Sequence, residues 1–430
     1  MPTKKLEDIK YYIYYKDDDF FVVWDSETDE IKKMMYKDMN LEYNWYIMLK
    51  YAKCESTPEG LRRYVNIFHT WCEELKRNKV LNVNWLSYNN NSWAVRLTFR
   101  RLAKNLYEDH EQIERLEANW MEKCYNSGIM YLDSKYEMKP FNGYGYDFCF
   151  CHPSVLACKN LLIPTKSGKE YTLTELPEIN KIKVGYYAVK ITCKNEQFKK
   201  IFSFSKDNVY TDKSLYHAMK HQKEFNIKIQ LIQNGKPNAY IYDSSCLTTG
   251  KKIFGNWFTK LFRLKKMFPK NGLVKHLGSS LSGELARRIK ITKTYDEIEK
   301  EKIDFGFNGE HDYEFENEKY RAGEDVRVIL RNNLQPYAYN IRFQPFLHSF
   351  VRNKVARVVY PRLNHAVRVY ADSVIFDKPF KFTEFDLFEE PKSTGLLAFL
   401  KANQKIDLSV LENDAGLIEA IKIHANIKRL

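Results

Sequence analysis

Apolar and polar positions follow two different periods along the chain. The opening segment alternates aromatic and charged residues (KYYIYYKDDDFFVVWDSETD), which predicts two strands joined as a hairpin. Residues 58–130 are rich in helix-forming residues, and their second half carries an apolar stripe at helical spacing. The stripe consists of Ile113, Leu116, Trp120 and Cys124.

From about residue 140 to residue 245 the pattern changes to β-branched and aromatic runs bounded by glycine. Strands are predicted in GYGYDFCFC and in VGYYAVKITC. A short strand, a helix cap at Thr211 or Asp212, and a helix from Lys213 are predicted in KDNVYTDKSLYHAMKHQ. A strand, a tight Asn-Gly turn and a second strand are predicted in FNIKIQLIQNGKPNAYIYD.

Helices return in the second half of the chain. The pattern predicts helices over residues 254–290 and 336–359, followed by a strand over residues 366–376. Strands and helices that alternate in mixed order are typical of an α+β architecture.

Composition narrows the class of protein. The 430 residues include 69 Lys and Arg against 55 Asp and Glu, so the net charge is 69 − 55 = +14. This charge favours an anionic partner but does not distinguish DNA, RNA and a membrane surface. No run approaches the ~18 consecutive apolar residues of a membrane-spanning helix, and the first residues lack a secretory signal pattern. Eight irregularly spaced cysteines favour reduced thiols. We expect a soluble, intracellular protein with no membrane partner.

Two stretches are basic and free of acidic residues. Residues 251–276 contain eight Lys or Arg residues, and a helix there would separate an apolar arc from a cationic one. The cationic arc contains Lys260, Arg263 and Lys266. Two interpretations stay open, a solvated basic face and a phosphate-binding helix. Residues 352–368 form the second stretch, and together the two favour a polyanionic partner such as DNA. Its predicted DNA contacts are Arg352 and Arg357.

Two carboxylates stand alone in apolar strand patterns. Asp147 is the only charge in YGYDFCFC, and Asp372 lies between apolar residues in VYADSVIF. A carboxylate in an apolar strand is costly to desolvate unless a cation compensates it. Mg²⁺ is the ion that uses one or two carboxylates together with substrate phosphates. Either aspartate alone is equally explained as the polar end of a strand.

Three segments in order resemble the polymerase motifs of family B DNA polymerases. Residues 147–153 (DFCFCHP) are similar to the first motif, residues 275–283 (KHLGSSLSG) to the second, and residues 370–375 (YADSVI) to the third. The resemblance is strongest to the protein-primed branch of viruses and linear plasmids. With the connecting segments it covers roughly residues 60–400.

The resemblance implies a right-hand palm with an antiparallel sheet, helical fingers, a reduced thumb and no complete exonuclease domain. The implied segments are an N-terminal region (1–135), the first part of the palm (136–250), the fingers (251–295), the second part of the palm (296–384) and the thumb (385–430). One interpretation of the N-terminal region is an exonuclease remnant.

The resemblance also assigns roles to residues. Asp147 and Asp372 become the catalytic ligands of two Mg²⁺ ions, with Mn²⁺ as a substitute and the Phe148 carbonyl as a further ligand. The nucleotide site comprises Phe148, His152, Arg263, Lys275 and Ser279. The implied partners are primer-template DNA, dNTPs and, for the protein-primed branch, a terminal protein. If the source is viral, the compartment is the host cytoplasm or nucleus.

Four departures from the family motifs bear on the metal and nucleotide sites. The Tyr of the first motif, which lies under the deoxyribose, is His152 here. The Asn and Tyr of the second motif are Ser279 and Ser282, and the first Asp of the third motif is Tyr370. A catalytically degenerate, polymerase-derived protein that binds nucleic acid therefore stays open beside a DNA polymerase.

Two further metal-site readings compete. Asp25 and Glu27 in WDSETD match the first motif of a proofreading exonuclease, and a turn after a strand explains them as well. A zinc site can be written through Cys149, Cys151, His152 and Cys158, although alternate residues of a packed strand give the same spacing.

Overall fold

The computed structural model describes most of the chain. The residues outside the description are 1–8, 17–19, 36–45, 49–56, 82, 88–90, 104–110, 149, 309, 320–324, 383–392, 398, 402–403 and 406–430. The predicted thumb over residues 385–430 lies largely outside the described residues. The chain divides into two compact units, each made of two stretches: unit 1 is Met1–Arg115 with Ile253–Ile341, and unit 2 is Leu116–Lys252 with Arg342–Leu430.

Unit 1 begins with a four-stranded sheet in the order β3-β2-β1-β4. Strands β1 and β2 pair antiparallel, with Tyr11 opposite Asp25, which confirms the predicted hairpin. Strand β3 extends the sheet antiparallel and β4 pairs parallel to β1. The bounds are β1 Tyr11–Lys16, β2 Phe20–Asp25, β3 Glu30–Met35 and β4 Tyr46–Met48.

The helices of unit 1 are α1 (Pro58–Arg77), α2 (Asn91–Ala103), most of α8 (Gly250–Met267) and α9 (Gly272–Leu285). The Thr57 side chain caps α1 by accepting from the backbone amide of Gly60. On α8 the predicted apolar arc is confirmed, because Trp257, Leu261 and Leu264 are buried.

A second sheet of unit 1 was not predicted from the sequence. It has the order β14-β17-β16-β15, and its core contains Ile298, Val328 and Leu330. Helix α10 (Tyr295–Glu301) connects β14 to β15. The strands are β14 Lys290–Thr294, β15 Phe305–Gly306, β16 Tyr313–Lys319 and β17 Arg327–Asn332. Charged residues alternate only irregularly in these strands, so the sequence pattern gave no strand signal.

Unit 2 contains an antiparallel five-stranded sheet in the order β20-β6-β19-β18-β5. The predicted single strand over 366–376 is wrong, because the chain reverses at residues 371–372 to form a hairpin of β18 and β19. The bounds are β5 Ile129–Leu132, β6 Phe141–Asp147, β18 Ala366–Ala371, β19 Ser373–Phe376 and β20 Ser393–Leu397.

A second sheet of unit 2 is built around β9 (Gly185–Thr192). The Asn-Gly turn is confirmed by a positive φ of 80° at Gly235, but its two flanking strands do not form a hairpin. Both β11 and β12 pair with β9, at residues 189–192 and 185–187. The remaining bounds are β8 Lys169–Tyr171, β10 Val209–Thr211, β11 Lys228–Leu231 and β12 Ala239–Ile241, and the short pair β7 Leu162–Pro164 and β13 Leu247–Thr249 lies apart from this sheet.

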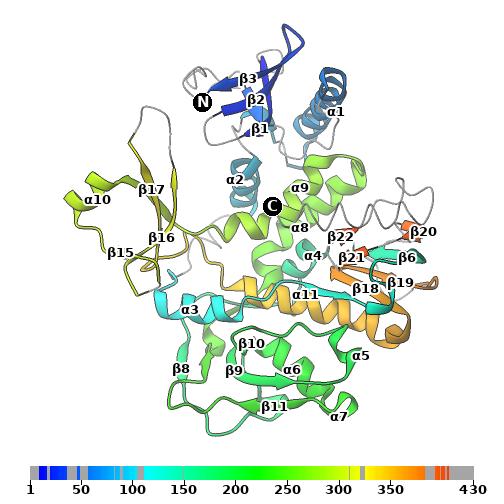
Figure 1. The fold of residues 1–430 in the computed structure, drawn as a ribbon, viewed down its shortest axis with the longest axis vertical. Coiled ribbons are helices and arrows are strands. Elements are labelled where there is room, and N and C mark those ends of the chain that lie inside the picture. Colours follow the sequence, from blue (N-terminus) through cyan, green and yellow to red (C-terminus); the bar gives the residue numbers. More distant parts are fainter. Residues whose placement is uncertain are drawn as a thin grey trace. The chain divides into compact units, whose positions relative to one another are not determined.

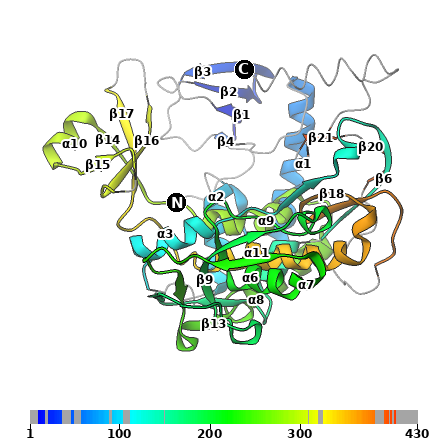
Figure 2. The ribbon, with the colours of Figure 1, turned by 60° about the horizontal axis from the view of Figure 1, so that its bottom comes forward.

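Helix α11 (Phe343–Val359) is the central helix of unit 2. It contacts α4, α6, β7, β10, β18 and β19, and both ribbon views place it beside α6 (Figures 1 and 2). It starts at Phe343, later than the predicted residue 336, and the helical prediction over 58–130 ends early, at Cys124. The other helices are α3 Arg115–Cys124, α4 Cys151–Leu156, α5 Glu196–Lys199, α6 Asp212–Lys220 and α7 Gln222–Phe225.

The helix cap predicted at the start of α6 is confirmed. The Thr211 hydroxyl accepts from the backbone amide of Ser214 at 3.2 Å, which satisfies one of the unpaired donors of a helix start. None of the helices in the described part of the chain is long and apolar enough to cross a bilayer.

Candidate active site

The two isolated aspartates lie at neighbouring positions on adjacent strands of unit 2. Asp147 is the last residue of β6 and lies opposite Ser373, the first residue of β19. The next backbone amide, that of Phe148, donates to the carbonyl of Asp372 at 3.2 Å. Both aspartates are half-buried. Residues that are 225 positions apart in the sequence therefore meet at one end of the sheet (372 − 147 = 225).

Asp372 occupies the turn of the β18–β19 hairpin. Tyr370 pairs with Ser373, so that Ala371 and Asp372 form a two-residue loop, and Ala371 has a positive φ of 54°. Such loops need left-handed backbone to match the twist of the strands. The turn packs closely on Gly128, where a Cβ atom would lie 2.6 Å from the Cα of Ala371. A glycine at 128 therefore lets the aspartate turn approach the start of β5.

Lys354 and Cys151 share the surroundings of the aspartate pair. The Lys354 ammonium lies 4.9 Å from the centre of the Phe148 ring. Burial raises the pKa of the Cys151 thiol, the Asp372 and Asp147 carboxylates raise it further, and Lys354 opposes them. The charges of Asp147, Asp372 and Lys354 therefore all act on this one buried thiol. Because its pKa is raised overall, the thiol stays protonated and is a poor metal ligand. Lys354 belongs to the second basic stretch, and nothing in its spacing connects it to Asp147.

His152 lies in the first turn of α4 and belongs to a chain of aromatic rings. Its ring is 5.7 Å from that of His348 on α11, and His348 in turn is 5.4 Å from Tyr125, both edge to face. Burial lowers the pKa of His152. Burial and the neighbouring His152 and Arg352 lower the pKa of His348 to about 3. Both imidazoles are therefore neutral at pH 7.

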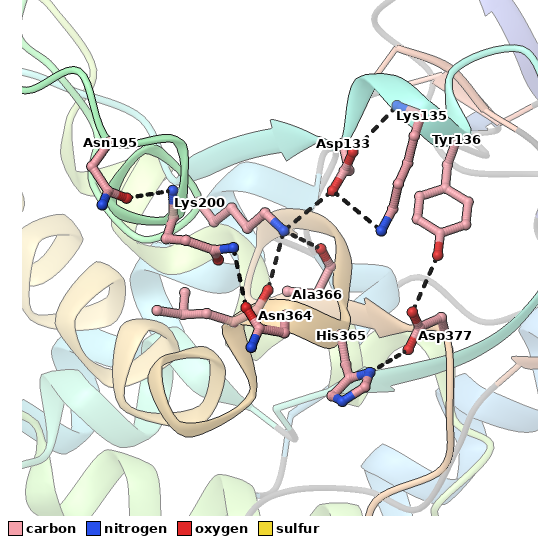
Figure 3. A network of polar contacts seen from close by, with 11 residues as sticks. Asp133, Lys135, Tyr136, Asn195, Lys200, Asn364, His365, Ala366 and Asp377 are labelled. Atoms are coloured by element: carbon pink, nitrogen blue, oxygen red, sulfur yellow. Dashed lines mark hydrogen bonds and ion pairs between the residues drawn. The ribbon is translucent and has the colours of Figure 1, made fainter. Parts of the chain in front are cut away.

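Polar contacts hold the base of the aspartate hairpin, where the chain enters and leaves it (Figure 3). His365 precedes β18 and Asp377 follows β19, and His365 Nδ1 lies 2.9 Å from Asp377 Oδ1. The Tyr136 hydroxyl donates to the other oxygen of Asp377 at 3.1 Å, and the backbone amide of Asp377 donates to the His365 carbonyl. These contacts could not be predicted from sequence spacing, because the residues that make them are dispersed along the chain.

Lys200 anchors the same region from the other side (Figure 3). Its side chain is buried, and the ammonium donates to Asp133 Oδ2 at 3.2 Å and to the carbonyls of Leu363 and Ala366 at 3.1 Å each. All three donors of the ammonium are thereby used. The contacts tie the segment after α5 to the first residue of β18.

We expect Lys200→Met to destabilise the protein by about 2–3 kcal/mol, because two carbonyls and one carboxylate lose their donor in a buried place. The measurement is the midpoint of urea unfolding. Lys199→Met is the matched control, since Lys199 is exposed and its ion pair with Glu196 lies on the surface. Equal midpoints for the two variants would contradict the anchoring role.

The remaining predicted nucleotide residues and two of the predicted DNA contacts lie in unit 1. Lys275 and Ser279 are one turn apart on the same exposed face of α9, and the Ser279 hydroxyl donates to the Lys275 carbonyl at 3.1 Å. Arg263 and Lys266 are exposed on α8, and Lys260 is half-buried there. These residues therefore form a basic, accessible surface on two consecutive helices.

The prediction that Arg352 contacts DNA does not fit its surroundings. Its side chain is buried, and its guanidinium donates to the carbonyls of Asn126 and Ser127 and to the hydroxyls of Ser214 and Ser349. Burial lowers its pKa to about 10. A long basic side chain looks the same in the sequence whether it is solvated or buried, which explains the error. Arg357 is exposed.

The other metal-site readings find little support. Both oxygens of the buried Asp25 are occupied by the amides of Glu27 and Thr28 and by the Lys32 ammonium. Burial works against ionisation, but these donors lower the pKa of Asp25 overall. Residues 26–29 form a turn, which favours the turn interpretation. Among the described residues no group of three or more His, Cys, Asp or Glu side chains can hold a metal ion, and Cys149 lies outside them.

The chemistry of the aspartate pair is compatible with Mg²⁺ as a ligand-bound ion. Two carboxylates and a nearby backbone carbonyl are hard oxygen ligands, and Mg²⁺ characteristically takes its remaining ligands from water and phosphate. A site with few protein ligands is therefore what such an ion uses. The neutral Cys151 beside it offers no competing thiolate.

Comparisons with known proteins identify a similar fold. No family model matches the chain, and no curated protein matches it. Phi29 DNA polymerase complexed with single-stranded DNA is similar in structure, with a TM-score of 0.52 and 10% identity over 80% of this chain and 57% of that one. The ternary complex of phi29 DNA polymerase with primer-template DNA and incoming nucleotide gives 0.50 and 12% over 74% and 55%. The chain thus spans less than two thirds of these polymerases, and at such low identity the likeness concerns architecture. The chain has a DNA polymerase-like fold, with mixed helices and antiparallel sheets.

Proposed function

We propose that this chain is a DNA-directed DNA polymerase that transfers nucleotides from dNTPs to a primer 3′-hydroxyl. One observation carries the proposal. In a polymerase-like fold, the β6–β19 register brings Asp147 and Asp372 to one end of a sheet. In the protein-primed form of the reaction, which the motif resemblance favours, the first acceptor is the hydroxyl of a terminal protein.

Asp147, Asp372 and the Phe148 carbonyl would hold two Mg²⁺ ions, or Mn²⁺ in their place. When bound, such ions lower the pKa of the attacking hydroxyl and neutralise the charge of the leaving pyrophosphate. The hairpin turn and the His365–Asp377 contact hold Asp372 at the strand end where Asp147 lies. The Lys354 ammonium lies over the ring of Phe148, the residue that follows Asp147.

The exposed basic surface of unit 1 supplies the other half of the proposal. Arg263 and Lys275 would bind the triphosphate of the incoming dNTP, with Ser279 one turn beyond Lys275. Lys260, Lys266 and Arg357 would contact the phosphate backbone of DNA as positioning charges without sequence preference. The burial of Arg352 excludes it from this set.

Primer extension with the purified chain tests the proposal. The mixture contains a labelled primer on a longer template, the four dNTPs and Mg²⁺, with parallel reactions in Mn²⁺. Template-dependent lengthening of the primer is expected, together with its loss on chelation by EDTA. A second substrate set, in which a labelled dNTP is offered with candidate terminal proteins, reports protein priming. Failure to extend any primer under either ion would contradict the proposal.

A catalytically degenerate, polymerase-derived nucleic-acid-binding protein is the alternative, and a specific observation favours it. Tyr370 stands where the family carries its first aspartate of the third motif, and its ring is partly exposed and covered by Arg368 at 4.9 Å. A site with one carboxylate fewer binds metal less tightly. DNA binding that persists without incorporation in Mg²⁺ or Mn²⁺ would support this alternative.

We expect His152→Tyr to sharpen selection for deoxynucleotides over ribonucleotides by about tenfold, since one hydroxyl clash or one lost contact is worth roughly 1–2 kcal/mol. The larger ring would extend from the first turn of α4 into the place where the resemblance puts the sugar. The measurement is the ratio of kcat/KM for dATP and ATP. The control is His311→Tyr, since His311 belongs to unit 1 and its side chain is partly exposed. An unchanged ratio in His152→Tyr would remove His152 from the sugar site.

A further inference from the structure

A cavity of about 620 Å³ lies between α6 and α11 within unit 2. This volume is within the ~300–1,000 Å³ range of small-molecule sites. Its walls come mainly from the two helices, with contributions from α7 and from the 3₁₀ turns over 179–181 and 360–365. Asp147 and Asp372 are not among the lining residues, although Lys354, which lies over the Phe148 ring, is one of them.

Positive charge exceeds negative charge on the walls. Of the two lining carboxylates, Asp212 forms an ion pair with Lys213, with 3.1 Å between Oδ2 and Nζ, and Glu224 Oε2 lies 3.3 Å from His221 Nδ1. Three further cations line the cavity, and none of them forms an ion pair with a carboxylate in the described part of the chain. They are Lys220, Lys354 and Arg357. The cavity therefore suits an anion.

Two buried polar atoms on the walls have no hydrogen-bond partner among the described residues. They are Asp212 Oδ1 and His217 Nε2, in side chains that are 4% and 8% exposed. Burial, with His221, Lys220 and Arg357 nearby, lowers the pKa of His217 to about 3, so the imidazole is neutral. Because buried polar groups of native proteins almost always have partners, both atoms point to a ligand that carries its own donors and acceptors.

Aromatic rings complete the cavity. The rings of His221 and Tyr360 lie 4.8 Å apart, and Tyr216 on the opposite helix keeps 43% of its surface exposed. Rings at such walls stack on planar ligands, and each stacked base contributes substantially to binding in nucleic-acid sites.

We infer that this cavity is a binding site for a nucleoside phosphate, with walls that do not include the two aspartates. The phosphate would lie among Lys220, Lys354 and Arg357, and the base would stack on the ring of Tyr360. A hydroxyl of the sugar or an amino group of the base would donate to Asp212 Oδ1, which has no partner among the described residues. A ligand with an anionic end, a planar ring and hydrogen-bond donors satisfies all three features, whereas inorganic phosphate satisfies only the first.

A nucleoside phosphate in this cavity could be a free nucleotide or one nucleotide of a single-stranded DNA. The inference does not depend on polymerase activity, because the readout is binding in EDTA, where extension is absent. The assay is calorimetric titration of the full chain with dAMP, with dATP and with a single-stranded deoxyadenosine decamer.

The test variant is Lys220→Gln with Arg357→Gln, two exposed residues whose change leaves the core intact. We expect its affinity for dAMP to fall about tenfold or more, since two charge-assisted contacts are lost. Lys190→Gln with Lys236→Gln is the matched control, because it removes the same charge from exposed positions of unit 2 outside the cavity. Asp147→Asn with Asp372→Asn should bind dAMP as the parent chain does.

The possible outcomes distinguish a free nucleotide from a DNA strand as the ligand, and they show whether the inference itself fails. Tight binding of dAMP without the decamer assigns the site to a free nucleotide, and tighter binding of the decamer with competition by dAMP assigns it to a strand. Equal losses in the test and control variants, competition by inorganic phosphate at the same concentration as dAMP, or loss of binding in the double aspartate variant would each overturn the inference. None of these results depends on whether primer extension succeeds.

Discussion

Replacing either Asp147 or Asp372 with Asn is expected to lower the rate of primer extension by about three orders of magnitude. Each change removes one negative charge from the pair that meets at the ends of β6 and the β18–β19 turn. Metal-mediated charge stabilisation is worth several kcal/mol in such transfers, and each 1.36 kcal/mol corresponds to a factor of ten. Loss of about 4 kcal/mol therefore predicts a thousandfold effect. The measurement is single-turnover incorporation of one dNTP.

Asp207→Asn is the matched control for the aspartate variants. Asp207 is exposed, belongs to the same unit and lies in the turn before β10, so its change should leave incorporation unaffected. Both active-site variants should still bind primer-template DNA, because the proposed phosphate contacts are unchanged. If Asp147→Asn and Asp372→Asn incorporate nucleotides at the parent rate, the two aspartates are not the catalytic metal ligands.

Arg342→Met is expected to cause the largest loss of stability, about 3–5 kcal/mol. Arg342 is fully buried before α11 and forms a two-point ion pair with Glu117 on α3, at 2.6 Å and 2.7 Å. The Tyr242 hydroxyl donates to Glu117 at 2.7 Å and the Ser167 hydroxyl at 3.2 Å. Removing the guanidinium leaves a carboxylate buried without its counter-ion, which is the costly way to break such a pair.

Unfolding in urea measures the effect of Arg342→Met. Glu117→Gln with Arg342→Met should recover part of the loss, because no unpaired charge then remains. Lys181→Met is the surface control, since its pair with Glu178 is exposed on both sides and should matter little. A midpoint for Arg342→Met equal to that of Lys181→Met would show that the pair does not stabilise the core of unit 2.

Local features were predictable because their causes are local. The hairpin of β1 and β2, the helix start at Thr211 and the two-sided helix α8 follow from the period of apolar residues and from a side chain that caps its own helix. Each of these depends on residues within a few positions of one another. The single strand predicted over 366–376 was wrong, because a run of apolar residues does not show where the chain reverses, and the positive φ at Ala371 makes it a hairpin.

The residues around the aspartates needed tertiary information. Lys354, Lys200 and the His365–Asp377 contact come from segments far apart in the chain, and no spacing in the sequence connects them. The same holds for Arg352, which the charge pattern assigned to DNA and the fold buries against backbone carbonyls.

The sequence by itself determined which side chains are chemically unusual: two carboxylates in apolar strands, a basic helix with one apolar face, and four departures from a polymerase motif set. Only the tertiary structure decided which of them meet. Pairing of β6 with β19 sets Asp147 beside Asp372, and packing of α6 on α11 encloses a cationic cavity. The physical reason is that periodicity and capping act over a few residues, whereas register and burial are fixed by contacts between distant segments, whose free energy no local pattern records.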